Sequence, residues 1–319
     1  MDEKKIQVGG QAVIEGVMMR GPKYLATAIR RKDKSIEVKK EKFTSITQKV
    51  KFFGLPIIRG FVSLIEMLII GIKTLNFSAQ RAEIDWQEES NKKIKEKSKF
   101  RRQAEDVLGY ALAFGLAFLL FVYLPYQLAS WLNLSKDNLY FNLFAGVIRI
   151  IFFVVYIWLI SYMKDVKRLF QYHGAEHKSV FAYENKVELT PSEIENFSTL
   201  HPRCGTSFIF FVLLVSIIVF SAVDTLVAYY WQTPSLPLRI AYHLVFLTPL
   251  ISGISYEILK LSGKNINHPL VKLMTAPGLA LQKITTQKPD HEQIETAVIA
   301  MKCALEMEIP PSIKFIKDE

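Results

Sequence analysis

Cysteine is scarce in this sequence: Cys204 and Cys303 are the only two among 319 residues. Two cysteines are too few for the disulfide framework of a small secreted protein, so we expect both to be reduced thiols. A cleavable signal peptide is not expected either, because no apolar segment follows closely behind the charged N-terminus. Insertion into a membrane would then be driven by an internal apolar segment.

Charged residues are nearly absent from four long segments, although they make up 22% of the chain. These segments are residues 107–135, 139–163, 204–231 and 238–261. Apolar stretches of 18 or more residues with few charges are long enough to cross a bilayer as helices. The sequence therefore predicts a mainly α polytopic membrane protein with four transmembrane helices, the first of them kinked or ended by Pro125.

Positive charge is distributed unevenly around these segments. Of the 40 lysines and arginines, 23 precede the first predicted span, six lie between the second and third, and seven follow residue 261, whereas the two outer turns hold only Lys136 and Arg239. Basic residues accumulate on the cytoplasmic side of membrane proteins. We therefore expect both termini and the central loop to be cytoplasmic, with the chain in an inner membrane. The net charge of +10 then reflects orientation, and no specific nucleic-acid partner is expected.

The sequence divides into six predicted segments: a cytoplasmic N-terminal region (1–55), an interfacial and a charged helix (56–105), spans one and two (106–163), a cytoplasmic loop (164–203), spans three and four (204–261) and a helical cytoplasmic tail (262–319). In the first segment, the β-rich runs Tyr24–Arg30 and Ser35–Phe43 flank a charged turn and predict a small β-hairpin. In the last, Asp290 and Gln293 predict the start of a terminal helix that runs to about Met307.

The apolar run Pro56–Phe77 allows two interpretations. It is rich in Ile, Leu and Phe but also contains Arg59, Glu66 and Lys73. Three charges are costly inside a bilayer, so we expect a helix that is buried or lies at the membrane surface. The other interpretation, a further span, would reverse the orientation of everything after it. Residues 79–105 are expected to form a charged, solvated helix.

His173, Glu176 and His177 form the pattern H-x-x-E-H in the central loop. On a helix, positions i, i+3 and i+4 share one face, so two imidazoles and a carboxylate converge. In zinc hydrolases of the inverted zincin type, two such histidines bind the metal and the glutamate takes a proton from water. The pattern predicts a divalent metal, zinc by preference, with both histidines as ligands and Glu176 as the general base. It is short enough to arise by chance as well.

A second cluster, His201-Pro202-Arg203-Cys204, ends the same loop. An open catalytic site needs a third ligand, for which His201 is the first choice, followed by Cys204, Glu184 and Glu257. Two alternatives stay open. In one, four nitrogen and sulfur ligands form a closed structural zinc site: His173, His177, His201 and Cys204. In the other there is no metal, and the histidines cap helices or contact lipid phosphates.

Some of the polar residues inside the predicted spans invite an interpretation of their own. Arg149 and Asp224 are both expected in the outer half of the bundle, where an Arg–Asp ion pair is the favoured interpretation and a transport pathway the other. His243 is expected to be a hydrogen-bonded histidine of the helix bundle rather than a metal ligand.

Three motifs together resemble one known family. They are G-G-Q-A-V-I-E-G-V-M-M-R-G-P at 9–22, Y-H-G-A-E-H-K at 172–178 and H-P-R-C-G-T-S at 201–207, with T-A-P-G-L at 275–279 in the tail. Over nearly the whole chain the sequence resembles the bacterial YqhQ family of membrane proteins. That family is usually labelled a predicted metal-dependent enzyme, a label that rests on the same histidines. The resemblance implies that Gln11, Glu15 and Arg20 belong to the site; a glycine-shaped turn with an internal salt bridge is the alternative.

Two functions are compatible with these features. One is a membrane-embedded, metal-dependent hydrolase acting at the cytoplasmic face on a lipid-linked or membrane-protein substrate, in which Arg203 or Arg20 holds an anionic group. The other is a non-enzymatic factor in membrane-protein biogenesis or assembly. The lipid bilayer is a partner in both cases, and other membrane proteins are further candidates. A transporter has little support, because paired broken helices are not evident.

Overall fold

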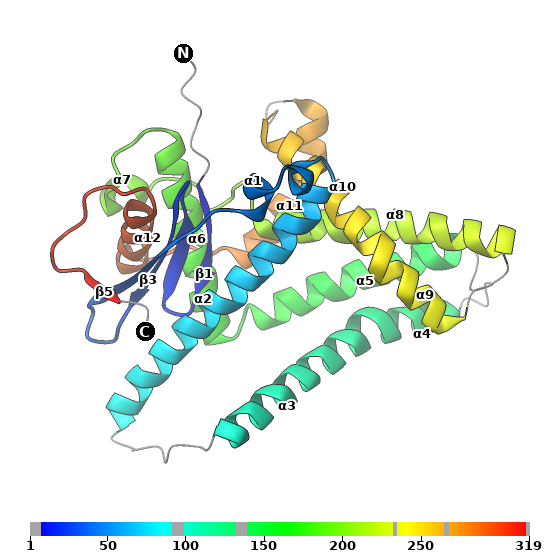
Figure 1. Ribbon diagram of the computed structural model, residues 1–319, viewed down its shortest axis with the longest axis horizontal. Coiled ribbons are helices and arrows are strands. Elements are labelled where there is room, and N and C mark those ends of the chain that lie inside the picture. The colour runs from blue at the N-terminus through cyan, green and yellow to red at the C-terminus, as the bar shows by residue number, and fades with distance from the viewer. Residues whose placement is uncertain (1–7, 91–98, 132–138, 232–234, 265–267, 317–319) are drawn as a thin grey trace.

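The computed structural model describes residues 8–90, 99–131, 139–231, 235–264 and 268–316. Figure 1 shows a small sheet and its covering helices at one end of the molecule, with long apolar helices extending away from them. Lys136, the basic residue that we expected in the first outer turn, lies outside the described residues.

Within the described residues, five strands form one sheet in the order β1-β2-β3-β4-β5: β1 (Gly9–Val13), β2 (Gly16–Arg20), β3 (Tyr24–Arg30), β4 (Ile36–Lys42) and β5 (Lys314–Ile316). The first four strands are antiparallel neighbours, and β5 runs parallel to β4. The predicted hairpin of β3 and β4 is confirmed. The glycine-rich motif before it is a second hairpin, with Glu15 in the left-handed region at φ 54° in its two-residue turn.

The two faces of the sheet are covered by different helices. On one face, β1 and β2 pack against α6 (Lys164–Glu184), and β2 and β3 pack against α12 (His291–Ala304), with α7 (Pro191–Ile194) joining the same hydrophobic core. On the other face, Met18 packs with Ile70 of α2 (Ile58–Ser90). Because alternate side chains of a strand point to opposite faces, Val17 and Met19 enter the first core while Met18 enters the second. The predicted capping box of Asp290 and Gln293 starts α12.

Among the described helices, four segments are long and apolar enough to cross a membrane: 107–130, 139–160, 205–231 and 237–263. The first comprises most of α3 (Lys99–Phe118), a π-helical turn (Leu119–Tyr123) and α4 (Leu124–Ser130); the second is α5 (Leu139–Ile160) and the third α8 (Gly205–Trp231). The fourth comprises α9 (Leu236–Tyr242), a second π-helical turn (His243–Leu247) and α10 (Thr248–Lys264). The chain thus has the character of a helical membrane protein.

The helix α2 differs from the two segments that we expected there. Its described part continues without a break from Ile58 to Ser90 and so combines most of Pro56–Phe77 with the start of the charged stretch; the described part of α3 starts at Lys99. It is not among the four candidate spans. A short helix α1 (Ile46–Lys49) and a 3₁₀ turn (Lys51–Gly54) connect the sheet to it. An ion pair between Arg59 and Glu257 of α10 fixes its first turn.

The predicted pair of Arg149 and Asp224 is wrong. Pro125 has no N–H, so the carbonyl of Phe121 four residues earlier lacks its helical donor, and Arg149 Nε donates to that oxygen at 2.7 Å. Asp224 instead pairs with Arg239 and accepts hydrogen bonds from Tyr242 Oη at 2.5 Å and His243 Nε2 at 2.8 Å. His243 is therefore a hydrogen-bonded bundle histidine, as expected.

Candidate functional site

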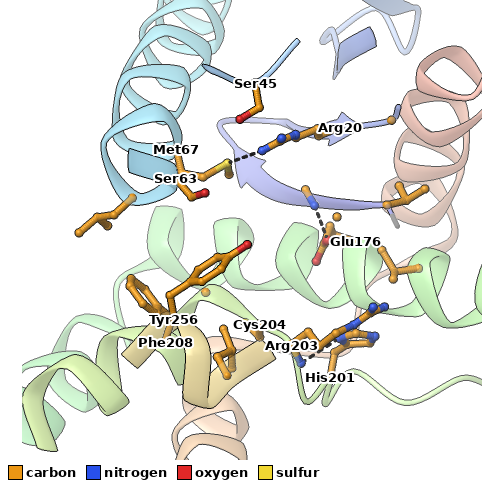
Figure 2. A pocket seen from close by; sticks show the side chains of 18 of the residues that line it. Arg20, Ser45, Ser63, Met67, Glu176, His201, Arg203, Cys204, Phe208 and Tyr256 are labelled. Carbon is orange, nitrogen blue, oxygen red and sulfur yellow. Dashed lines mark hydrogen bonds between the residues drawn. The ribbon is translucent and has the colours of Figure 1, made fainter. Parts of the chain in front are cut away.

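The two histidine motifs and the glycine-rich motif line one cavity of about 520 Å³. It lies between β1 and β2, the helices α2, α6 and α10, and the beginning of α8. Its lining includes Gly10 and Arg20 from the glycine-rich motif, and it is shown from close by in Figure 2. Segments far apart in the sequence thus meet where the small sheet joins the membrane helices.

His173 and His177 lie one helical turn apart on α6 and are held by backbone carbonyl groups. His173 Nδ1 lies 2.8 Å from the carbonyl oxygen of Thr285, and His177 Nδ1 lies 2.5 Å from that of Thr199. A carbonyl oxygen can only accept, so each Nδ1 carries a proton and Nε2 is the ring nitrogen that is left to bind a metal. Metal-binding histidines are typically oriented in this way by a second partner on the other ring nitrogen.

Gly174 permits this arrangement. A Cβ at that position would lie 2.1 Å from the backbone oxygen of Gln287, so only glycine allows α6 to approach the chain between α11 (Pro269–Thr285) and α12. The close approach is fastened by the Gln287 N–H, which donates to the Phe170 carbonyl at 2.9 Å. It places the Thr285 carbonyl within reach of His173.

Cys204 completes a group of three with the two histidines. One ligand atom from each of the three residues lies within 4.8 Å of the other two, and Cys204 Sγ is 3.2 Å from His173 Nε2. Around a tetrahedral zinc ion, neighbouring nitrogen and sulfur ligands are about 3.3–3.7 Å apart, as follows from bond lengths of about 2.0–2.3 Å. The thiol also accepts from the Thr206 N–H at 3.4 Å at the start of α8, which fixes its direction.

His201, our first choice for the third ligand, is not part of this group. Its Nε2 lies 3.4 Å from Glu184 Oε2, and its ring packs on Phe181 with the centroids 4.5 Å apart. Burial lowers the pKa of His201, and the charge of Glu176 opposes that shift. Glu184, another third-ligand candidate, forms an ion pair with Arg203 and lies 3.4 Å from the His201 ring nitrogen.

The position of the His201 loop is set by Gln282, a residue that the sequence did not draw attention to. Its fully buried side chain donates to the His201 carbonyl at 2.8 Å and accepts from the His201 N–H at 2.8 Å. It also donates to Ser207 Oγ at 2.8 Å on α8. These bonds connect α11 to both sides of Cys204. The one signal in the sequence that could have pointed to this role is a glutamine that directly follows an apolar run of the predicted helix.

Glu176 is buried beside the three-residue group and is oriented by the glycine-rich motif. Its Oε1 accepts from the Gly10 N–H at 2.8 Å, and its Oε2 lies 3.5 Å from His177 Nε2. A Cβ on Gly10 would lie 2.2 Å from the Met18 carbonyl oxygen and 3.2 Å from Glu176 Cγ. Glycine is therefore required for the strand β1 to approach this carboxylate.

Arg20 lines the cavity from the end of β2, and Arg203 lines it from the loop before α8 (Figure 2). Burial lowers the pKa of each guanidinium; for Arg20 the negative charge of Glu66 opposes that shift. Arg203 forms an ion pair with Glu184, whereas Arg20 has no carboxylate within ion-pair distance in the described part of the chain. Tyr256 on α10 is a further cavity residue that the sequence alone did not single out.

Three residues named as possible site residues lie elsewhere. Gln11 donates to Thr74 Oγ1 at 2.8 Å on α2, and Glu15 pairs with Arg168 at the beginning of α6. Glu257 pairs with Arg59. Each of these side chains joins the sheet or a span to a neighbouring helix. Of the glycine-rich motif, Gly10 and Arg20 therefore reach the cavity, while Gln11 and Glu15 hold the hairpin in place.

Comparison with known proteins gives two matches. Residues 55–307 match the family described as "Protein of unknown function (DUF1385)". The chain is 36% identical over 313 residues to the "Uncharacterized protein YqhQ" of Bacillus subtilis (strain 168), covering 94% of this chain and 92% of that protein. Neither description names an activity, a metal or a substrate, and no solved structure gives a significant match. The chain therefore belongs to the DUF1385 family and is a relative of YqhQ.

Proposed function

We propose that the protein is a metal-dependent hydrolase of the cytoplasmic membrane. The observation that carries the proposal is the convergence of His173, His177 and Cys204 next to the buried Glu176 inside one cavity. Two imidazoles and a thiolate are a ligand set that suits zinc. When bound, such an ion would supply a Lewis acid that polarises a substrate oxygen or a water molecule.

The arrangement favours an open site over a closed structural one. A closed site would need His201 as the fourth ligand, and that side chain is turned toward Glu184. Three protein ligands leave one position for water or substrate, which is the pattern of catalytic zinc sites. In His173 and His177, Nε2 is the ring nitrogen that is left to bind a metal, because their Nδ1 protons are engaged by carbonyl groups.

Glu176 has the position that a general base requires. The Gly10 N–H holds one carboxylate oxygen, and the second faces His177 Nε2 at 3.5 Å. A water molecule within the cavity, beside the second carboxylate oxygen, could transfer its proton to Glu176 while it attacks the substrate. Arg203 and Arg20 provide positive charge for an anionic group of the substrate.

The site's place beside the membrane helices points to a membrane-bound substrate. Cys204 immediately precedes α8, and Tyr256 and Leu259 of the fourth candidate span line the same cavity. The distribution of lysine and arginine favours a cytoplasmic location for this end of the helices and for both termini. We therefore infer a lipid-linked or membrane-protein substrate that is reached from the cytoplasmic surface.

The test combines metal analysis with isotope incorporation. The full-length protein and the variants His177→Ala and Glu176→Gln are purified in detergent, and their zinc content is measured. Inner membranes from cells producing each variant are then incubated in ¹⁸O-water, and lipids and peptides are searched for ¹⁸O by mass spectrometry. Glu188→Gln, an exposed glutamate just beyond α6, is the matched control.

We expect wild type and Glu188→Gln to contain one zinc and to produce a common ¹⁸O-labelled product. Glu176→Gln should keep the metal and lose the product, and His177→Ala should lose both. A metal-free wild type, or a His177→Ala variant that retains zinc, would refute the metal site. Zinc without a Glu176-dependent labelled product would refute hydrolysis and favour a structural metal in a non-enzymatic assembly factor.

A further inference from the structure

Arg20 is an unusual residue in this cavity, because no carboxylate of the described residues pairs with it. Its guanidinium lies over the Phe43 ring, 4.6 Å from Cζ to the centroid, and Nη1 lies 3.7 Å from Met67 Sδ. The buried Glu66 is engaged elsewhere: it accepts from Ser45 Oγ at 2.6 Å and the Ile46 N–H at 2.5 Å. A partly buried cation without an anionic partner is costly. The Arg20 guanidinium is therefore available to an external anion.

Two further polar groups face the same space. Figure 2 shows the side chains of Ser63 and Tyr256 directed into the cavity together with that of Arg20. Neither hydroxyl has a hydrogen-bond partner among the residues that the structure describes. A guanidinium and two hydroxyl groups offer several donors to one ligand, and the planar fork of arginine matches the oxygens of a phosphate.

The wall beside these donors is apolar and comes from membrane helices. Leu64 and Met67 belong to α2, Phe208 lies near the beginning of α8, and Leu259 lies near the end of α10. Phe208 and Leu259 are both parts of candidate membrane spans, at the ends nearer the sheet. A ligand that fits both parts of this cavity therefore has an anionic head and an adjoining hydrocarbon segment.

We propose that the cavity binds a phosphate-bearing amphiphile, with its phosphate on Arg20 and its hydrocarbon chain against Leu64, Phe208 and Leu259. The inference rests on the proposed function in treating the cavity as the substrate site, and it names the substrate class. Binding itself requires no metal, because Arg20 is on a different element from the three-residue group. A phosphate on Arg20 would lie in the same cavity as Glu176, the proposed general base, because both side chains line it.

The test is direct binding to the full-length protein in detergent. The probe is fluorescently labelled phosphatidic acid; labelled diacylglycerol, labelled fatty acid and inorganic phosphate serve as comparison ligands. The variants are Arg20→Met, which removes the charge, and Arg20→Lys, which keeps the charge and removes the fork. Lys23→Met, at an exposed position just beyond β2, is the matched control.

We expect wild type and Lys23→Met to bind phosphatidic acid saturably, at least tenfold more tightly than the other three ligands. Arg20→Met should weaken that binding at least tenfold, and Arg20→Lys by a smaller factor, with the zinc content of both unchanged. Equal binding by Arg20→Met would overturn the role of Arg20. If inorganic phosphate binds as tightly as phosphatidic acid, the hydrocarbon chain is not part of what is recognised. If fatty acid binds as tightly, the phosphate is not.

These outcomes are separate from those for the metal site. Loss of phosphatidic acid binding in Arg20→Met with zinc retained supports this inference whether or not hydrolysis is found. A metal-free wild type that still binds phosphatidic acid through Arg20 would refute the proposed hydrolase and leave this inference standing. If Arg20→Met fails to fold, the Arg20→Lys variant provides the test. Unchanged affinity of that variant for phosphatidic acid would refute recognition of the phosphate by the planar guanidinium group.

Discussion

Replacing Gly174 by alanine tests how the candidate site is held together. The new Cβ would lie 2.1 Å from the Gln287 carbonyl oxygen, so the two segments must separate by about 1.3 Å to reach an ordinary contact distance of 3.4 Å. A movement of that size would break the hydrogen bond from Gln287 N–H to Phe170 and the one between His173 and Thr285, now 2.9 and 2.8 Å long.

The expected cost combines two effects. Overpacking of a close contact costs about 1–3 kcal/mol, and each lost buried hydrogen bond adds about 1 kcal/mol. We expect Gly174→Ala to lose roughly 3–5 kcal/mol of unfolding free energy and to melt several degrees lower. Because His173 also loses its orienting carbonyl, zinc affinity should fall about 10–100-fold.

The assay is thermal unfolding of the detergent-solubilised protein followed by tryptophan fluorescence, with a zinc titration on the same samples. Gly115→Ala is the matched control, since no atom lies within 4 Å of a Cβ at that helical position and alanine favours a helix. We expect this control to melt at or slightly above the wild-type temperature. A Gly174→Ala variant with wild-type melting and wild-type zinc affinity would refute the close-approach argument.

Two more predictions follow from buried groups. Gln282→Met removes three hydrogen bonds at the His201 loop and should lower the unfolding free energy by roughly 2–5 kcal/mol. The control Gln80→Met, at an exposed position of α2, should change the unfolding free energy by less than about 0.5 kcal/mol. Equal melting temperatures of the two variants would contradict the role of Gln282 in holding the His201 loop. Burial raises the pKa of the Cys303 thiol to about 11 from its ordinary 9.0. The unfolded thiol ionises first as the pH rises, so stability is complete below pH 9 and declines by about 2–3 kcal/mol up to pH 11. In Cys303→Ala, the loss of stability between pH 9 and pH 11 should be smaller by this amount when melting is measured as a function of pH. The same loss of stability in the variant and in wild type would contradict the prediction.

Long-range composition and short helical patterns could be read from the sequence. The four candidate spans were found because a run of some 20 uncharged residues has few other interpretations. The start of α12 at Asp290 follows from its capping residues. The sequence indicated only a loop over 164–203, although the spacing of His173, Glu176 and His177 fits the helix α6 on which they lie. The first hairpin was missed because its turn, Ile14–Glu15, lacks the glycine or asparagine that usually marks one.

Partners across the bundle could not be derived in the same way. Arg149 was expected to pair with Asp224 by depth alone, but the carbonyl that Pro125 leaves free is nearer, and Arg239 reaches Asp224 instead. The choice between His201 and Cys204 depended on an irregular loop whose direction is set by Gln282, 81 residues away from His201. Contacts of this kind depend on tertiary packing, which no local pattern encodes.

The central claim is a metal site in which Cys204, and not His201, is the third ligand. Near-ultraviolet absorption of the cobalt-substituted protein tests it most directly, because thiolate coordination produces a charge-transfer band that imidazole coordination does not. We expect this band in wild type and in His201→Ala, and its loss in Cys204→Ser. A wild-type protein without the band, or a band lost in His201→Ala and kept in Cys204→Ser, would contradict the proposed ligand set.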